Sequence, residues 1–464
     1  MTLVKLPVFI CFCCFILATL ENVNAASEER FLAQPLDHFN EFNEETWTMR
    51  YFVNEGLYQD GGPIFIYIGG DYQVGTYWLE HGHMFDIAVD LNGIVFGTET
   101  RFFGQNQPRN DTSTENLRFL STDQILADTA RLIDHIKQQD GRLSNAKVIL
   151  VGQLYGGNIA SWFRVKYPSY ADGLWSSSSF VEARLNFAEY LEIVGDDLRV
   201  HGSLDCYRRI WRAFRTMENL INGGRSHLFD DMFGLCNSLD ASNDLEVDRF
   251  FASIVEDVSL GIINGDYLYV HDMCQDITNI NITNDLIAFS EWFLIEHRWQ
   301  GCFQMNFQAQ IDFLTGSDWN DFGVISGRRQ YQYLTCTEYG WFATTDSNNQ
   351  PFGSRIRLNY FIELCRRVFG EWITEEMLQE NDETFNLNFG GNRPQITNAF
   401  FTNGGMDPHR AVNVLEDIGD SVEARTLPFY GHSIDLNSLS DDDSPTVRNA
   451  KIRVRELITQ WVEN

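Results

Sequence analysis

Basic residues are scarce in this chain. Lys and Arg number 34 against 65 Asp and Glu, which gives a formal net charge of −31 at pH 7. A surface of that sign repels phosphate backbones and anionic lipid headgroups, so nucleic acid and acidic membrane surfaces are excluded as expected partners. The charge suits a protein that stays soluble in an acidic compartment, where protonation neutralises part of it.

Long apolar runs are also few. One run, residues 6–20, follows Lys5 and precedes a small-residue tripeptide that ends at Ala25. This pattern predicts a secretory signal over residues 1–25. A transmembrane anchor is the competing interpretation, but the run is short for a membrane span and no second run follows it. We therefore expect a protein without a membrane anchor, secreted by preference and lysosomal as the alternative.

Cysteines with the close spacing of a zinc site are absent after the signal. Six of the nine cysteines remain there, and no two of them form a Cys-x₂₋₄-Cys pair. An even number in a secreted chain predicts three disulfides, and the sequence alone leaves fifteen pairings open. Two glycosylation sequons, at Asn110 and Asn281, fit the same secretory route. The six cysteines are Cys206, Cys236, Cys274, Cys302, Cys336 and Cys365.

A third metal ligand is missing beside His81 and His83. Two histidines alone are too few for a stable zinc site, so this pair is interpreted as a loop or surface pair. No metal and no cofactor are expected.

Serine is missing where one motif requires it. Residues 147–168 read as an apolar strand, a glycine-bracketed turn and a helix, which is the arrangement of the α/β-hydrolase nucleophile elbow, G-x-S-x-G. The glycines let strand and helix approach closely and permit a strained residue at the apex. That apex residue is Leu154. Without the serine, such a turn fits any α/β protein, so it is weak evidence by itself.

Two later residues stand in the order that the elbow requires. In α/β-hydrolases the triad runs nucleophile, acid, histidine, with each member at the end of a strand. Asp407 and His432 both follow predicted strands, in loops that contain glycine. The alternative is a helix-capping aspartate and an ordinary loop histidine. The joint order favours Leu154, Asp407 and His432 as the three triad positions.

Strand and helix patterns alternate in two parts of the chain. They predict a parallel sheet with right-handed crossovers. Between the two parts, helical patterns dominate and all six remaining cysteines occur. We predict an α/β-hydrolase core over residues 26–182 and 376–464, with an inserted, mostly helical, disulfide-stapled cap over residues 183–375. The expected core strands are residues 47–53, 64–68, 92–97, 148–151, 173–179, 396–401 and 424–429.

Several motifs in one order resemble a family of serine exopeptidases. The family is that of lysosomal Pro-X carboxypeptidase, dipeptidyl peptidase II and thymus-specific serine protease, and the chain resembles the last most closely. The likeness runs from about residue 31 to the C-terminus. The matching motifs begin at Gln34, Gly62, Glu99, Glu115, Tyr155, Trp162, Cys336, Asn403 and His432.

This resemblance carries expectations of its own. It implies a helical cap that roofs the active site, exopeptidase action beside proline in working members, and a homodimer such as some members form. The expected oxyanion donors are backbone N–H groups of Tyr155 and of the loop around Gly70. The disulfides that it implies are Cys206–Cys274, Cys236–Cys302 and Cys336–Cys365.

The departures from the family pattern concern the chemistry. Leu154 holds the serine position, and leucine has no oxygen that could attack a carbonyl. Its isobutyl group is also expected to crowd the oxyanion hole. Residues 70–72 replace Asn-Glu-Gly, Phe102 and Phe103 replace two tyrosines, and His409 replaces a tryptophan. These changes put the proline pocket in doubt.

Three hypotheses follow. The first is a pseudoenzyme that binds a peptide or a partner protein in the old cleft. The second is an exopeptidase active at acid pH with a non-standard nucleophile, although Ser161 is expected to point away from His432 and Ser176–Ser179 end a neighbouring strand off the strained turn. The third is a secreted structural or storage protein.

Overall fold

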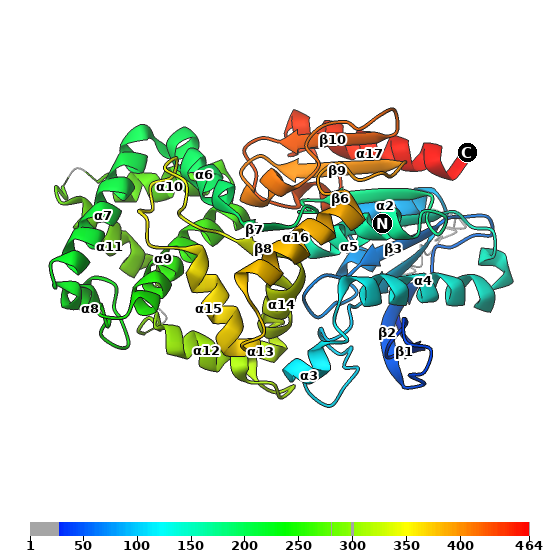
Figure 1. The fold of residues 1–464 in the computed structure, drawn as a ribbon. Coiled ribbons are helices and arrows are strands. Elements are labelled where there is room, and N and C mark those ends of the chain that lie inside the picture. The colour runs from blue at the N-terminus through cyan, green and yellow to red at the C-terminus, as the bar shows by residue number, and fades with distance from the viewer. Residues whose placement is uncertain (1–26, 280, 298–300, 464) are drawn as a thin grey trace, which may run out of the picture.

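The computed structural model describes residues 27–279, 281–297 and 301–463, so the predicted signal lies outside the described residues (Figure 1). Eight strands form one sheet in the order β1-β2-β4-β3-β5-β6-β9-β10. The strands are β1 (Glu28–Pro35), β2 (Thr46–Asn54), β3 (Ile64–Ile68), β4 (Ile94–Thr98), β5 (Val148–Gln153), β6 (Gly173–Ser177), β9 (Ala399–Gly404) and β10 (Val422–Leu427).

The sheet is parallel from β4 to β10, and only the β1–β2 and β2–β4 pairs are antiparallel. The central strands are buried on both faces, which explains why they read as continuous apolar runs. In β3, Ile64, Ile66 and Ile68 join one hydrophobic cluster, whereas Phe65 and Tyr67 join the cluster on the opposite face. The predicted fold class is confirmed; the edge strand β1 had no sequence prediction.

Helices cover both faces of this sheet. Side chains of α4 and α5 pack in the cluster with Ile64 and Ile66, and those of α2 and α17 pack in the cluster with Phe65. Ser444 Oγ accepts a hydrogen bond from Val447 N, which is the contact of an N-cap residue, and so caps the first turn of the last helix. The core helices are α1 (Tyr77–Glu80), α2 (His83–Asp90), α3 (Thr114–Leu117), α4 (Thr122–Gln139), α5 (Leu154–Lys166), α16 (Glu375–Phe389) and α17 (Pro445–Glu463).

Two local sequence features, the capping-box pattern Ser121-Thr122-Asp123-Gln124 and the pair His81 and His83, form contacts that differ from those their patterns predict. Ser121 caps α4 through Gln124 N, but the Gln124 side chain bonds to Asp37 and His38 instead of closing a reciprocal capping box. His83 is fully buried and its Nε2 lies 2.8 Å from the carbonyl oxygen of Lys451 in the sequence-distant helix α17, so it is a core residue and not a loop or surface residue. The sequence spacing could not show this contact.

The cap packs around its own aromatic core. Phe214, Phe250 and Phe289 are fully buried there, and Figure 1 shows the cap helices beside the core, at the left. Its helices are α6 (Ala188–Asp197), α7 (Leu204–Asn222), α8 (Phe229–Met232), α9 (Asp244–Asn264), α10 (Tyr267–Ile277), α11 (Asp285–His297), α12 (Phe307–Thr315), α13 (Phe322–Ile325), α14 (Arg328–Leu334) and α15 (Leu358–Phe369). A small sheet pairs β7 (Arg184–Asn186) with β8 (Gly340–Phe342).

The disulfides of the structure join Cys206–Cys274, Cys236–Cys302 and Cys336–Cys365, the pairs that the resemblance implies. All three lie in the helical part of the chain. After this part, α16 returns to the core, where Phe385 packs on Trp162 of α5. The limits 26–182, 183–375 and 376–464 stay predictions.

The family motif that begins at Glu99 supplies one residue to each of two buried ion pairs, which stabilise the loop after β4. Glu99 is completely buried and bonds to Arg50 at 2.6 Å. Arg101 pairs with Asp128 at 2.6 Å and also donates to two backbone carbonyls. Buried charges need such full pairing, so these motif residues have a structural role at the base of the site.

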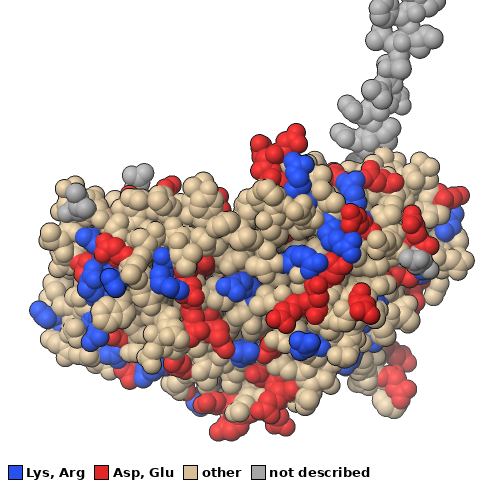
Figure 2. Space-filling model, turned by 90° about the horizontal axis from the view of Figure 1, so that it is seen from above, with Lys and Arg blue, Asp and Glu red and all other residues tan. Residues whose placement is uncertain are grey.

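The acidic surplus does not gather in one patch on the face seen in Figure 2. On the face seen in Figure 2, Asp and Glu side chains form several groups, and Lys and Arg lie between them. No helix of the described part of the chain is long and apolar enough to cross a membrane.

The carboxyl group of Asp197, at the end of α6, is buried where the cap packs on the core, and its burial makes the stability of the fold depend on pH. Its Oδ2 has no hydrogen-bond partner among the described residues, and His201 Nε2 lies 3.7 Å from Oδ1. Burial raises the pKa of Asp197 to about 8, and the negative charges of Asp196 and Asp407 add to this, whereas Arg410 opposes it. Between about pH 4 and pH 8 the folded chain therefore holds a proton that the unfolded chain has released, and the free energy of unfolding falls as the pH rises.

We expect Asp197→Asn to remove this penalty. At pH 8 the variant should gain roughly 1–3 kcal/mol of unfolding free energy over the wild type, with no gain at pH 4. Thermal or denaturant unfolding across this pH range measures the difference. Asp272→Asn, which removes an exposed carboxylate of α10, is the control. Equal pH slopes for Asp197→Asn and the wild type would contradict the prediction.

Candidate active site

The turn between β5 and α5 has the strained shape of a nucleophile elbow. Its apex, Leu154, has φ +50°, which is the left-handed region and costs an ordinary residue about 1–2 kcal/mol. Two close approaches enforce the turn: a Cβ on Gly152 would lie 2.4 Å from the Gly156 oxygen, and a Cβ on Gly156 would lie 2.2 Å from the Ile68 oxygen. Only glycine fits at both positions, so strand and helix meet as the sequence predicted.

The side chain at this apex is aliphatic. Leu154 is half-buried and packs against the main hydrophobic cluster of the core. It offers neither a nucleophilic atom nor a proton for a base to remove. The backbone strain is thus present without the hydroxyl group that such strain presents to a substrate in hydrolases.

Asp407 and His432 lie close together, but Asp407 has a nearer partner. His409 Nδ1 is 2.9 Å from Asp407 Oδ1, and His409 N donates to the same oxygen at 3.0 Å. His432 Nδ1 is 3.6 Å from Oδ2, beyond hydrogen-bond distance, and has no partner among the described residues. Because an ionised carboxylate only accepts, Nδ1 of His409 carries the proton in this pair.

The electrostatics agree with this change of partner. Asp407 is 1% exposed, and burial alone would raise its pKa. The charge of His409 and its hydrogen bond, followed by the contribution of His432, hold the pKa of Asp407 well below its ordinary value. Asp407 is therefore a permanent anion whose main stabilising partner is His409.

His409 was not predicted as a partner of Asp407. The available signal was the order Asp407, Pro408, His409, in which the aspartate caps the short helix η5 (Pro408–Val412) and Pro408 takes its first position. In that geometry the cap carboxylate faces the backbone N–H of His409, and the imidazole lies beside it.

Serine hydroxyls near the elbow are already engaged. Ser161 donates to Gly157 O at 2.7 Å, Ser176 to Ser179, and Ser179 to Asn413. Ser177 donates at 2.7 Å to Asp435, which is buried and also accepts from Trp175. These bonds fix the end of β6 and the loop after His432, and they leave the hydroxyls of these serines committed to the scaffold.

Ser178 lies nearest to the histidine loop. It has φ +49°, and its Oγ accepts a hydrogen bond from the backbone N–H of Ser433 at 2.9 Å. No helix follows it to form a second elbow. Its hydrogen bond holds the end of β6 against the loop that contains His432 and Ser433.

The expected oxyanion residues are neighbours. A Cβ on Gly70 would lie 3.6 Å from the Tyr155 Cβ and 3.2 Å from the Gly156 nitrogen, so this loop touches the first turn of α5. The Tyr155 hydroxyl is buried and lies 3.0 Å from that of Tyr339. The structure brings these two backbone segments together below Leu154.

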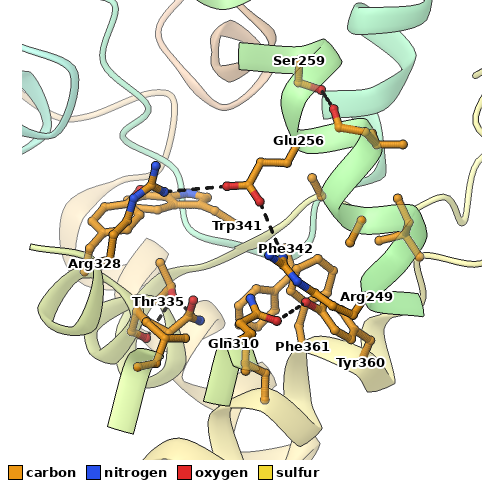
Figure 3. A pocket seen from close by; sticks show the side chains of 18 of the residues that line it. Arg249, Glu256, Ser259, Gln310, Arg328, Thr335, Trp341, Phe342, Tyr360 and Phe361 are labelled. Atoms are coloured by element: carbon orange, nitrogen blue, oxygen red, sulfur yellow. Dashed lines mark hydrogen bonds and ion pairs between the residues drawn. The ribbon is translucent and has the colours of Figure 1, made fainter. Parts of the chain in front are cut away.

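A cavity of about 550 Å³ adjoins this region within the cap (Figure 3). Its wall reaches the elbow through Tyr331, whose ring packs on Tyr155, and through His409, the one lining residue that follows residue 375. Among the described residues that line it, Leu154 and His432 do not occur. Figure 3 shows Glu256 between Arg328 and Arg249, above Trp341, Phe342, Tyr360 and Phe361.

Metal-type ligands do not gather in this site. In the described ranges no group of three His, Cys, Asp or Glu side chains is placed to hold a metal ion.

The predicted glycosylation residues Asn110 and Asn281 are both exposed, far along the chain from the elbow.

Comparison with known proteins matches residues 34–454 to the family Serine carboxypeptidase S28. Thymus-specific serine protease of Mus musculus is 28% identical over 455 residues, which cover 95% of this chain and 88% of that protein. Lysosomal Pro-X carboxypeptidase of Homo sapiens is 26% identical, over 94% of this chain and 88% of that protein. Among solved structures, proline iminopeptidase of Mycobacterium smegmatis aligns over 94% of this chain and 99% of its own, with TM-score 0.40 and 10% identity.

The partner change at Asp407 can be tested in a chain with a restored hydroxyl. We expect Leu154→Ser to react slowly with a fluorophosphonate, because His432 Nδ1 lacks the carboxylate partner that orients a catalytic base. The double variant Leu154→Ser/His409→Phe should react at least about tenfold faster, because the Asp407 carboxylate can then accept a hydrogen bond from His432 without competition from the His409 imidazole.

Labelling rates followed by mass spectrometry measure this difference. His81→Phe in the Leu154→Ser background is the control, because His81 is exposed and stacks on Tyr77 away from Asp407. Equal labelling rates for Leu154→Ser and for Leu154→Ser/His409→Phe would show that His409 does not prevent Asp407 from hydrogen-bonding to His432.

Proposed function

The chain belongs to the Serine carboxypeptidase S28 family, and we propose that it is a member that binds peptides without hydrolysing them. The observation that carries this proposal is Leu154 with φ +50° at the apex of a complete elbow. The turn is formed at the backbone, and its reactive atom is absent. In a serine peptidase, loss of the nucleophile leaves only the small rate enhancement that binding and the oxyanion hole supply.

The rest of the triad supports the same proposal. A working triad needs the aspartate to hold the histidine in position for proton transfer. Here His409 hydrogen-bonds to the Asp407 carboxylate, while His432 Nδ1 lies 3.6 Å from it without a hydrogen bond. Two independent features, at residues 154 and 409, thus oppose hydrolysis, which argues against the chain being one substitution away from a fully efficient peptidase.

The cavity in the cap supports the proposal that the chain binds peptides. The cavity has a volume within the range of small-ligand sites and is walled by aromatic rings with a few charged groups. A storage or structural role would not require such a space. An active exopeptidase with another nucleophile is disfavoured because the serine hydroxyls Ser161, Ser176, Ser177 and Ser179 donate to other groups.

The proposed site of action is extracellular, with the lysosome as the alternative. Three disulfides support an oxidising compartment, because such bonds do not persist in the reducing cytosol. The exposed sequon residues Asn110 and Asn281 are compatible with glycosylation on this route. We propose that the mature chain acts as a peptide receptor or carrier outside the cell.

The test is activity-based labelling of the purified wild type at pH 5 and pH 7. We expect no fluorophosphonate adduct and no cleavage of peptides with proline at either end, because Leu154 has no hydroxyl and the hydroxyls of Ser161, Ser176, Ser177 and Ser179 donate to other groups. Leu154→Ser with His409→Phe serves as the positive control and Leu154→Ala as the matched negative control. A stoichiometric adduct on the wild type would overturn the proposal and identify the substitute nucleophile.

A further inference from the structure

The cap helix α7 is basic within an acidic protein. It carries four arginines and two carboxylates, whereas the whole chain has a net charge of −31. Figure 1 shows this helix at the outer end of the cap, at the left, with the core at the right. Charges more than about 10 Å away are largely screened at about 0.1 M salt, so a local basic surface attracts an anionic partner in spite of the net charge.

The four arginines of α7 divide into two pairs. Arg209 and Arg212 face the carboxylate of Asp285, at 3.6 Å and 2.5 Å, and join α7 to the start of α11. Arg208 and Arg215 are exposed, and among the described residues neither takes part in an ion pair. The guanidinium groups of this second pair are therefore available to a partner outside the chain.

The two available arginines lie on one exposed face of the helix with an aromatic ring between them. Arg208, Trp211 and Arg215 are spaced by three and four residues, which places them side by side on a helix. Trp211 is 40% exposed, and the Arg215 guanidinium lies 4.9 Å from the centre of its ring. Asn219 and Asn222 are exposed and continue the same spacing. These five residues form the α7 stripe, which is about 21 Å long from Arg208 to Asn222 at the helical rise per residue.

The carboxylates of α7 lie off this stripe. Glu218 accepts hydrogen bonds from the backbone N–H and the hydroxyl of Ser354, so it is engaged with a neighbouring loop. Asp205 lies in the first turn and forms no ion pair within the described part of the chain. At the far end of the stripe, Arg355 donates to Asn222 Oδ1 at 2.8 Å. The surface thus presents three guanidinium groups in a row, with no carboxylate between them.

The shape and the chemistry of the stripe restrict its partner. Guanidinium groups form paired hydrogen bonds with the oxygens of sulfate and phosphate groups, and an exposed indole offers an apolar face to a flat ring. A broad anionic membrane would bring the acidic remainder of the surface against it, and the net charge of −31 opposes that contact. A single linear polyanion contacts the stripe alone. The three disulfides support a compartment outside the cytosol, where sulfated polysaccharides are common linear polyanions.

We propose that the α7 stripe binds a linear sulfated polysaccharide. Arg208, Arg215 and Arg355 each pair with a sulfate group, and Trp211 packs against a sugar ring. Binding at the stripe does not depend on the proposed peptide binding, because no described residue that lines the cavity belongs to α7. The contact would hold the protein on a polysaccharide matrix while the cavity stays free for its ligand.

Surface plasmon resonance on immobilised heparin tests this contact. We expect the wild type to bind, with an affinity that falls as the salt concentration rises, because each ion pair releases counterions. The double variant Arg208→Gln/Arg215→Gln should bind at least about tenfold more weakly, since two charge-assisted contacts are lost. Trp211→Ala should weaken binding several-fold and leave the salt dependence unchanged, because the indole carries no charge.

The controls separate the stripe from charge and folding in general. Arg118→Gln/Arg393→Gln removes two exposed arginines of the core, and among the described residues neither of these forms an ion pair. This matched variant should keep the affinity of the wild type for heparin, and heparin stripped of its sulfate groups should not bind. Thermal unfolding of the stripe variants should match that of the wild type, because the substituted arginines are exposed.

The remaining outcomes overturn the proposal. A wild type that does not bind heparin, or equal affinities for the wild type and Arg208→Gln/Arg215→Gln, would show that the stripe is not a polysaccharide site. Phosphatidylserine vesicles or single-stranded DNA that bind as tightly as heparin, and lose affinity in the same double variant, would replace the sulfated polysaccharide with that other polyanion. Peptide binding in the cavity is measured separately, and none of these results alters it.

Discussion

The close approach of α5 to β3 is the constraint on which the site depends. Gly156 lies so near the Ile68 carbonyl that a single methyl group would collide with it. This contact holds the start of the helix against the centre of the parallel sheet, and the chain can enter the helix only through a residue with positive φ. Leu154 occupies that residue and bears the strain. The neighbouring Gly70 loop is placed by the same contact, so the elbow and the expected oxyanion segments form one rigid unit.

Buried charges join this unit to the rest of the molecule. Glu99 with Arg50 and Arg101 with Asp128 lie under the loop after β4, and each pair is supported by further hydrogen bonds. Such groups are costly to bury and become favourable only when every partner is present. Their retention preserves the geometry of the cleft independently of whether hydrolysis takes place. This explains how the family motifs can persist around an apex that lacks the nucleophile.

At the border between core and cap, one carboxylate lies beside two histidines and accepts a hydrogen bond from one of them. Asp407 is anionic and buried, and it satisfies His409 at hydrogen-bond distance while His432 remains 3.6 Å away. His409 also lines the cavity, with its ring against Tyr190 and Phe180. The carboxylate that would serve catalysis in the triad therefore stabilises a residue of the cavity wall. The negative charge of Asp407 therefore stabilises His409 in the wall of the proposed binding site more than it orients His432 as a catalytic base.

The sequence by itself determined the strands of the sheet other than β1, the elbow and the order of Leu154, Asp407 and His432, because these depend on local periodicity, on glycine spacing and on residues that follow strand ends. The cap as a helical insertion was readable for the same reason, and the disulfide pairs followed only from the family resemblance. Local patterns failed where a distant residue competes for a side chain. Gln124 bonds to Asp37 instead of closing its own capping box, and His83 is buried against α17.

Only the tertiary structure decided which partner Asp407 takes and what lines the cavity. Arg249 and Glu256 lie two turns apart on α9, whereas Arg328 comes from α14 and His409 from η5, and no pattern of spacing brings these three elements together. Their positions follow from how α9, α14 and η5 pack, which is set by apolar contacts spread over the whole cap and core. The charge of the cavity and the pairing of a buried carboxylate are thus properties of that packing, because both depend on distances between residues that the sequence does not place side by side.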